Sequence, residues 1–120
     1  MSDALQVPLA EGVACERTYW IVMDGEPRPL FIRWLQPQPM EVGWECPVQT
    51  TWPDGRVRIR RIGGEDSAQA LFLAFCMVGS ELIVSKNPVY WFDLNDDLGL
   101  PMLSAVADVV AERKARFEAK

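Results

Sequence analysis

Histidine is absent from this sequence of 120 residues, and its absence excludes more chemistry than any other feature of the composition. Histidine is the usual general base in enzymes, the usual partner of a serine or cysteine nucleophile, and the commonest ligand of transition metals. We therefore expect no histidine-dependent catalysis, no bound metal and no cofactor. The sequence offers no candidate catalytic residue, and an enzymatic activity is not the favoured interpretation.

Long apolar runs are also absent. A helix needs roughly 18 consecutive apolar residues to cross a bilayer, and the longest candidate, residues 68–84, is interrupted by Gln69, Gly79, Ser80 and Glu81. The first four residues lack the basic segment and apolar core of a signal peptide. The sequence therefore predicts a cytoplasmic protein without a membrane segment.

Cysteine is scarce and scattered, because Cys15, Cys46 and Cys76 form no C-x-x-C pair. Such spacing argues against a disulfide framework and against a zinc site. Cys46 and Cys76 belong to apolar faces, which predicts buried, inert thiols. Cys15 lies beside Glu16, whose charge opposes formation of the thiolate.

The residues that are present suit a folded domain. Hydrophobic residues make up 49% of the chain, with five Trp and five Phe, and charged residues make up 24%. A chain of this length usually forms one domain. We therefore predict a single domain over residues 1–120, with a loosely ordered N-terminal arm at residues 1–14, where no hydrophobic periodicity is found.

Charge is unevenly distributed along the chain, whose net charge is −5. Between Arg28 and Arg61 there are six arginines and three acidic residues, a local charge of +3, whereas the remainder carries −8. An asymmetry of this kind bears on partners and association rather than on the fold.

A first β-hairpin is predicted near the N-terminus. Residues 17–23 are aromatic and β-branched, an Asp-Gly turn follows at 24–25, and residues 30–35 form the return strand. Pro27 and Pro29 cannot donate to a ladder of hydrogen bonds, which predicts either a widened hairpin or a sheet edge.

A second hairpin comprises residues 41–51 and 56–62, joined by a Pro-Asp-Gly turn at 53–55. Alternation divides each strand into two faces. The apolar face of its first strand comprises Val42, Trp44, Cys46 and Val48. In its second strand we expect Val57 and Ile59 to point inward, and the outward residues to be Arg56, Arg58 and Arg60.

The register of this second hairpin has two solutions. A three-residue loop pairs Thr50 with Arg58 and sets the arginines on the same face as Trp44 and Cys46. A two-residue loop pairs Gln49 with Arg58 and matches polar with polar. A bulge at Pro47 would allow either register, so the sequence leaves both open.

Two helices are predicted in the second half of the chain. Residues 66–69 match a capping box, and the apolar segment from Ala68 to Val78 predicts a buried central helix that ends near Gly79 or Leu82. After it, residues 82–84 and 89–92 are short apolar runs, of which we expect at least the second to be extended. Proline at 101 suits the first position of a last, amphipathic helix from Met102 to about Phe117. Its apolar stripe comprises Leu103, Val106, Ala107, Val110 and Phe117.

These elements together predict an α+β fold. We expect an antiparallel sheet of four to six strands, including the two N-terminal hairpins. The sheet packs against the buried central helix and the C-terminal amphipathic helix.

Four stretches between positions 44 and 101 resemble those shared by a family of small uncharacterised bacterial proteins, a domain-of-unknown-function family. They are residues 44–47 (W-E-C-P), 64–71 (G-E-D-S-A-Q-A-L), 79–82 (G-S-E-L) and 97–101 (D-L-G-L-P). The G-x-D-S-x-Q-A-L helix start is the most specific of them. The resemblance implies a strands-then-helices layout and a bacterial origin, and it implies no catalytic residue.

Arginines are the residues best suited to contact a partner or an anion, since guanidinium groups in a row match carboxylates or phosphates. The candidates are Arg56, Arg58, Arg60, Arg61 and Arg33. The plainer interpretation is a solvated face paired with Glu41 and Glu45, where each exposed ion pair contributes about 0–1 kcal/mol. Nearby tryptophans would allow stacking on single-stranded nucleic acid. The sequence pI of about 4.7 disfavours that reading, because nucleic-acid-binding domains are usually basic.

Two further motifs invite a ligand but fit one poorly. Gly63-Gly64 precedes a helix without phosphate-loop spacing, and the acidic residues at 65–66 would repel a phosphate there. Residues 93–99 begin like a calcium loop, but Leu98 and Ser104 occupy the positions that need glycine and glutamate. We therefore predict a turn and helix cap at the first motif, and an Asx turn without a metal at the second.

The function that these features favour is a non-enzymatic protein–protein interaction module, of the immunity or accessory type. The alternative is a domain, with or without enzymatic activity, that binds a small anionic ligand through the arginines. Trp52 and Trp91 are the candidates for exposed aromatic side chains at an interface. A protein partner is expected, a membrane is not, nucleic acid is disfavoured, and a homodimer through an edge strand or the last helix is left open.

Overall fold

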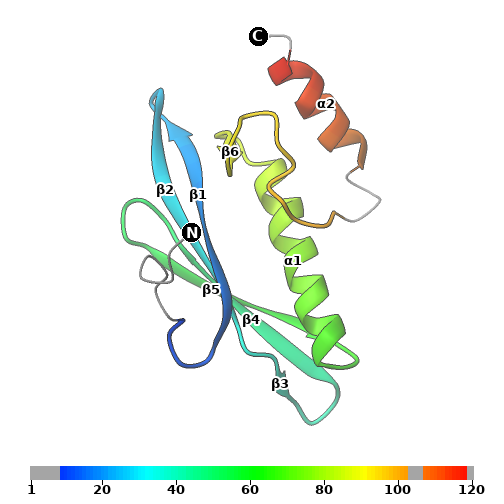
Figure 1. The fold of residues 1–120 in the computed structure, drawn as a ribbon. Helices are drawn as coiled ribbons and strands as arrows, with labels where there is room; N and C mark the ends of the chain where they lie inside the picture. Colours follow the sequence, from blue (N-terminus) through cyan, green and yellow to red (C-terminus); the bar gives the residue numbers. More distant parts are fainter. Residues whose placement is uncertain (1–8, 103–106, 119–120) are drawn as a thin grey trace, which may run out of the picture.

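The computed structural model describes residues 9–102 and 107–118 (Figure 1). In chain order the elements are β1 (Val13–Met23), β2 (Glu26–Leu35), β3 (Gln38–Pro39), β4 (Trp44–Thr51), β5 (Val57–Gly64), α1 (Ser67–Ile83), β6 (Val89–Tyr90) and α2 (Ala107–Glu118). The predicted α+β fold with two N-terminal hairpins is therefore confirmed. The predicted start of the last helix, with Leu103 and Val106 of its apolar stripe, lies outside the described residues.

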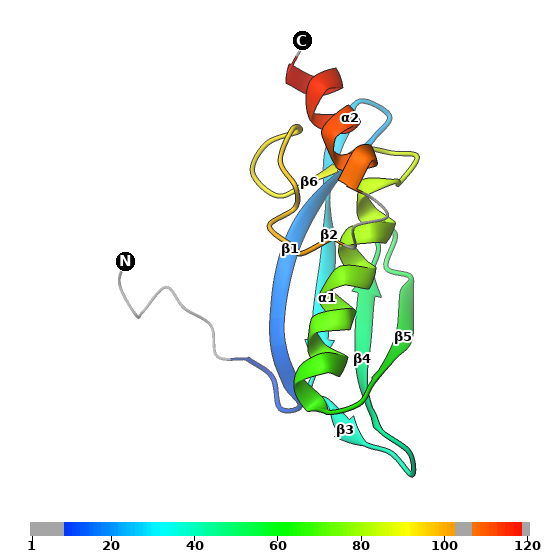
Figure 2. The same cartoon turned by 90° about the vertical axis from the view of Figure 1, so that its right-hand side faces the viewer.

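All six strands belong to one antiparallel sheet. β5 pairs along the whole of β4, and the other edge of β4 pairs with β2 and, beyond the end of β2, with β3. Across the sheet the order is thus β5, β4, β2, β1, β6, which makes β5 an edge strand. α1 lies along one face of the sheet only, as the two ribbon views show (Figures 1 and 2).

The first hairpin is tight rather than widened, because a two-residue loop joins its strands. Asp24 and Gly25 have φ values of 53° and 77°, as a type I′ turn requires. Pro27 and Pro29 lie within β2, at positions that alternate with the hydrogen-bonded pairs to β1. On the other side, β4 pairs with β2 only from Phe31 onward, so neither proline needs an N–H. Of the two predicted arrangements, the sheet edge is therefore the one found at these prolines.

Several strand and helix ends differ from the predicted ones. β1 begins at the buried Val13, inside the segment predicted as an arm. β4 begins only at Trp44, because Gly43 adopts a positive φ of 74° and interrupts the strand. Val42 consequently does not join the apolar face of β4 and is exposed. α1 ends at Ile83, one residue beyond the longer of its two predicted ends.

The second hairpin has the three-residue loop, since Thr50 pairs with Arg58. Arg58 and Arg60 therefore lie on the face of the sheet that α1 covers, together with Cys46 and Val48. Val57 and Ile59 lie on the opposite face and are 55% and 52% exposed. The prediction that these two residues point inward is wrong, because a change of one residue in register exchanges the two faces of a strand.

α1 begins with the predicted capping box. The Asp66 carboxylate accepts a hydrogen bond of 2.8 Å from the Gln69 N–H, and the Gln69 side chain accepts one of 2.6 Å from the Glu65 N–H. The helix side that faces the sheet is buried, whereas Phe72 on the solvent side is 53% exposed. The buried residues of the helix are Ala70, Ala74, Cys76, Val78, Gly79, Leu82 and Ile83.

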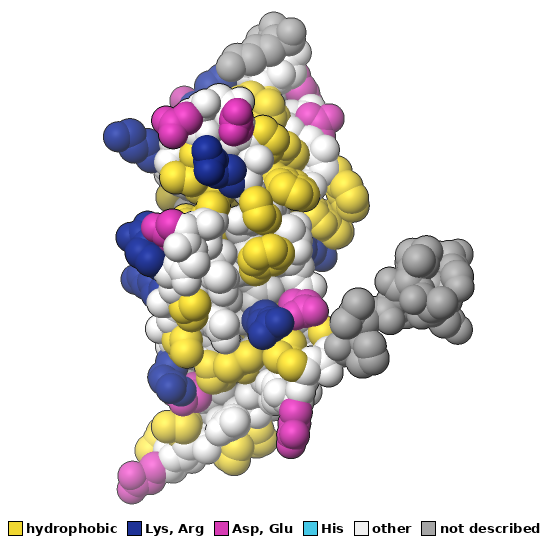
Figure 3. Space-filling view, turned by 90° about the vertical axis from the view of Figure 1, so that its left-hand side faces the viewer, with side chains coloured by type: hydrophobic (Ala, Val, Ile, Leu, Met, Phe, Trp, Pro, Cys, Tyr) yellow, Lys and Arg dark blue, Asp and Glu magenta, His cyan; other side chains and the backbone are white. Residues whose placement is uncertain are grey.

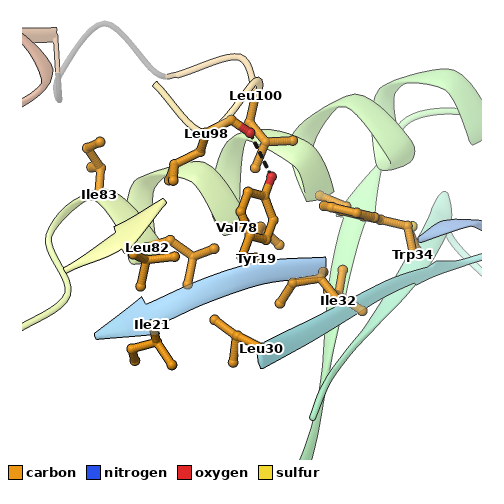
Figure 4. Packing of buried hydrophobic residues seen from close by; sticks show 14 of the residues in the cluster. Tyr19, Ile21, Leu30, Ile32, Trp34, Val78, Leu82, Ile83, Leu98 and Leu100 are labelled. Carbon is orange, nitrogen blue, oxygen red and sulfur yellow. Dashed lines mark hydrogen bonds between the residues drawn. The ribbon is translucent and has the colours of Figure 1, made fainter. Parts of the chain in front are cut away.

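The hydrophobic core lies between the sheet and α1 (Figure 4). The sheet contributes large side chains, and the helix contributes small ones where it crosses the strands. Leu98 and Leu100, from the segment that follows β6, close the core at the β1 side. The fully buried large side chains include Tyr19, Leu30, Ile32, Trp34, Val89 and Leu98.

Residues 91–101 form a loop that is organised by a single carboxylate. Asp96 accepts hydrogen bonds from the backbone N–H groups of Trp91, Phe92, Asp93 and Leu98. The Asx turn predicted for residues 93–99 is therefore confirmed. The Leu98 N–H donates to the Asp96 carboxylate, and the Gly99 N–H donates to the Asp97 carboxylate. The carboxylates of this loop thus serve the backbone.

Two side chains of β1 bind this loop to the sheet. The Arg17 guanidinium lies 3.6 Å from the centroid of the Trp91 ring and donates to the carbonyls of Leu98 and Gly99 at 3.0 Å. The buried Tyr19 hydroxyl donates to the Leu98 carbonyl at 2.8 Å (Figure 4). Leu98 itself has a positive φ of 68°, so these bonds hold a backbone conformation that a leucine rarely adopts.

We predict that Gly64→Ala destabilises the fold while the neighbouring Gly63→Ala does not. A Cβ at Gly64 would lie 2.7 Å from the Cα of Ala70, whereas one at Gly63 meets nothing closer than 3.8 Å. Overpacking of this kind costs about 1–3 kcal/mol, and Gly63 sets the baseline for an exposed strand position. Urea denaturation of the two variants is the measurement, and equal midpoints would contradict the close approach of β5 to α1.

We predict that Tyr19→Phe lowers the free energy of unfolding by about 1 kcal/mol, because the hydroxyl loses its hydrogen bond while Arg17 still satisfies the Leu98 carbonyl. Burial raises the pKa of Tyr19 to about 12, against the favourable charge of Arg17. The unfolded state therefore releases the tyrosine proton first, near its ordinary pKa of 10, and the stability contributed below pH 10 is lost as the pH rises toward 12.

The measurement is the free energy of unfolding as a function of pH in wild type and variant. The difference between the two curves should be constant below pH 10 and should shrink above it. A difference that stays constant to pH 12 would contradict the burial of a neutral hydroxyl at this position.

Candidate interaction surface

The face of the sheet opposite α1, here called the open face, has no element of the described residues packed against it (Figures 1 and 2). Pairing between the strands aligns its side chains in rows that run across four strands. One row comprises Thr18, Phe31, Thr51 and Val57. The next row comprises Glu16, Arg33, Gln49 and Ile59.

Large apolar side chains are exposed on the open face. Phe31 is 45% exposed, Trp20 is 38% exposed, and Val57 and Ile59 are more than half exposed. In the space-filling view of this face, hydrophobic side chains gather over its middle and upper part, while Lys and Arg side chains lie along the edge where β5 runs (Figure 3). A solvated face of an antiparallel sheet is usually polar, so this composition is typical of a contact surface.

A hollow of about 600 Å³ lies over the centre of the open face. Its lining includes Phe31 and the ion pair between Arg33 and Glu16. In this pair the Arg33 Nε lies 2.9 Å from the Glu16 Oε2. Because strands of a single sheet form its lining, the hollow is a shallow, open depression and not an enclosed pocket. A side chain that protrudes from a partner surface could occupy it.

Most of the predicted partner-binding arginines are paired with carboxylates of the same chain. Arg33 pairs with Glu16, Arg56 with Asp54, Arg61 with Glu45, and Arg60 with Glu81 of α1. Of the acids predicted as their partners, Glu45 is used and Glu41 is not. Arg58 has no ion pair within the described residues.

These arginines do not converge on one point. Arg58 and Arg60 lie on the helix-side face of β5, whereas Arg61 and Arg33 lie on the open face, each beside its own carboxylate. A compact anion such as phosphate is bound by several donors that point to one place. The arrangement is instead a series of separate ion pairs along β5, with Arg58 left without one in the described residues.

The tryptophans predicted as exposed are half-buried in the structure. Trp52 packs against the core beside the turn of the second hairpin, and Trp91 packs under Arg17. Phe92, which is adjacent to Trp91, is the exposed member of that pair. Each tryptophan therefore has an intramolecular contact that accounts for its position.

The exposed apolar residues of the open face were not among the predicted site residues. Trp20 lies between the buried Tyr19 and Ile21, and Phe31 between the buried Leu30 and Ile32. Strands that are apolar on both faces carry no alternation that would tell the two faces apart. One sequence signal does point to these residues. A strand that is apolar on both faces is usually covered on both faces, and the two predicted helices are too few to cover both sides of the sheet.

The three cysteines are free thiols in protected surroundings. Burial, and secondarily the neighbouring Cys15, raises the pKa of Cys46 to about 11. Burial also raises the pKa of Cys15 and of Cys76. Since the thiolate is the reactive form, none of the three is activated, and the buried thiols predicted for Cys46 and Cys76 are confirmed.

One buried charge was not predicted. Arg113 of α2 is 4% exposed and donates to the Val89 carbonyl of β6. Burial lowers the pKa of its guanidinium, while the charge of Asp96 opposes that shift. The contact ties α2 to the edge of the sheet near β6.

Within residues 9–102 and 107–118, no three His, Cys, Asp or Glu side chains form a group that could hold a metal ion. No helix in the same part of the chain is long and apolar enough to span a membrane.

Comparison with known proteins gives one match. No curated protein and no solved structure is similar to the chain. A family description, domain of unknown function DUF6968, matches residues 15–102, from the third residue of β1 to the segment that closes the core. Because this match spans most of the chain, the protein belongs to the DUF6968 family.

Proposed function

We propose that this chain is a non-enzymatic protein-binding module of the bacterial cytoplasm, of the immunity or accessory type, and that the open face is its contact surface. The partner on this face presents an apolar patch with few charges. Immunity and accessory proteins are a class analogy rather than a relationship. The proposal concerns the mode of action, which is binding without chemistry.

The observation that carries the proposal is the exposed apolar side of the sheet. Trp20, Phe31 and Ile59 come from three different strands and lie on one surface. Aromatic side chains at the centre of such a patch contribute most of the binding energy in protein interfaces. The charges on the face, in the pairs Glu16–Arg33 and Glu45–Arg61, cancel, which favours an apolar partner surface over a highly charged one.

The alternative of an anion-binding domain receives less support. Its arginines lie on two faces of the sheet, and four of the five predicted ones are paired with carboxylates. The protected thiols and the carboxylates used by the backbone of residues 91–101 leave little for catalysis. A protein partner makes use of the open face, whereas a small anion would not.

We predict that a photo-crosslinking amino acid at Phe31 captures one defined partner in the source cells, whereas the same amino acid at Phe72 does not. The two phenylalanines are 45% and 53% exposed, and they lie on opposite sides of the protein. After identification and purification of the captured partner, Phe31→Ser should weaken its binding at least tenfold, about 1.4 kcal/mol. Phe72→Ser is the matched control and should leave the Kd unchanged.

Three outcomes would overturn the proposal. The first is equal capture at both positions, which would indicate non-specific contact. The second is capture of only a second copy of the chain, which would make the open face a homodimer interface. The third is a Kd that Phe31→Ser does not change.

A further inference from the structure

The outer edge of β5 is an unpaired strand edge. β5 comprises eight residues and pairs with β4 along its length, and no strand of the described residues pairs with its other side. The ribbon view from the α1 side shows this edge at the border of the sheet (Figure 2). An edge of this length is a template for an added strand unless charge or shape blocks it.

The hydrogen-bonding pattern determines which backbone groups are free. The Trp52 N–H donates to the Arg56 carbonyl at 2.9 Å, so the backbone of Arg56 faces β4. Alternation in an antiparallel ladder then directs the N–H and C=O groups of Val57, Ile59 and Arg61 away from β4. Pro47, which has no N–H, lies opposite Arg61 and agrees with this pattern.

The arginines of this edge are mostly compensated by ion pairs with Asp54, Glu81 and Glu45, and Arg58 is the one without an ion pair in the described residues. Arg56, Arg58, Arg60 and Arg61 lie within six residues, and the first acidic residue after them is Glu65. If two copies of β5 paired antiparallel, arginines would lie opposite or near arginines, and like charges at such positions are destabilising. A strand with acidic residues would instead form cross-strand ion pairs, above all with Arg58, which has none in the described residues.

We propose that the β5 edge accepts an extended acidic segment of a partner protein as an additional antiparallel strand. This inference rests on the proposed function and names the kind of segment that is bound. The two faces of β5 define its pattern. An acidic residue of the segment lies beside Arg58 on the helix-side face, and β-branched apolar residues lie beside Val57 and Ile59 on the open face. Main-chain bonds supply affinity, and alternate side chains supply specificity.

The test uses a fluorescein-labelled peptide of eight residues, the length of β5, in which valine alternates with glutamate. Its binding to the full chain is followed by fluorescence anisotropy, and a peptide with lysine in place of glutamate is the control. We expect the glutamate peptide to bind at least tenfold more tightly than the lysine peptide. Added salt should reduce this preference, since the arginines are exposed to solvent.

Two pairs of variants separate strand addition from simple charge attraction. Ile59→Pro removes one outward N–H without removing a bond to β4 and should abolish binding, whereas Ile59→Thr keeps the N–H and should retain it. Arg58→Glu should reverse the preference between the two peptides, whereas Arg58→Lys should preserve it. If Ile59→Pro does not fold, as judged by its thermal transition, the Arg58 pair decides the question.

Equal binding of the two peptides to wild type would overturn the inference, as would unchanged binding by a folded Ile59→Pro. Such a result leaves the proposed function standing if the crosslinked partner of Phe31 still binds. If the peptide binds as expected but no partner is captured through Phe31, the edge is a contact surface and the open face is not.

Discussion

The structure depends on a sheet that is covered on one face only. α1 and residues 91–101 lie on the same side of it, and no described element lies on the other (Figures 1 and 2). A two-layer fold normally meets this constraint by making the solvated face polar. Here Trp20, Phe31 and Ile59 occupy that face instead. Since exposure of these groups does not stabilise the folded monomer, a contact surface is the simplest reason for the pattern, and the proposed function follows from it.

The covered side explains why the two edges of the sheet differ. β1 is paired with β6, and its Arg17 and Tyr19 hold the Leu98 carbonyl, so residues 91–101 cap that edge and complete the core. Asp96 keeps this loop in shape by accepting from four backbone N–H groups. In the described residues no loop caps the outer edge of β5 in this way, although α1 packs beside β5 at Gly64 and pairs with it through Arg60 and Glu81. The unpaired edge of the sheet is thus that of β5, the strand that carries Arg58.

Local chemistry could be predicted from the sequence, and the orientation of faces could not. The capping box at residues 66–69, the Asp-Gly turn and the Asx turn depend on residues a few positions apart, and all three are found. The orientation of β5 depends on one residue of loop length, and the register that matches polar with polar residues, that of the two-residue loop, is not the one found. The bond between Arg17 and Leu98 joins residues 81 positions apart, and neither residue has a local pattern that indicates the other.

The charge asymmetry of the sequence has a meaning that only the fold reveals. Acidic residues from outside the basic middle, such as Glu16 and Glu81, come back to pair with Arg33 and Arg60. The local positive charge is thereby largely compensated, and what is left is concentrated at Arg58 on the free edge. A positive edge repels another copy of itself and attracts an acidic strand, so the same charges that protect the edge from aggregation also select what it accepts. At β5, the positive charge that disfavours pairing with a second copy is thus the same charge that favours an acidic strand.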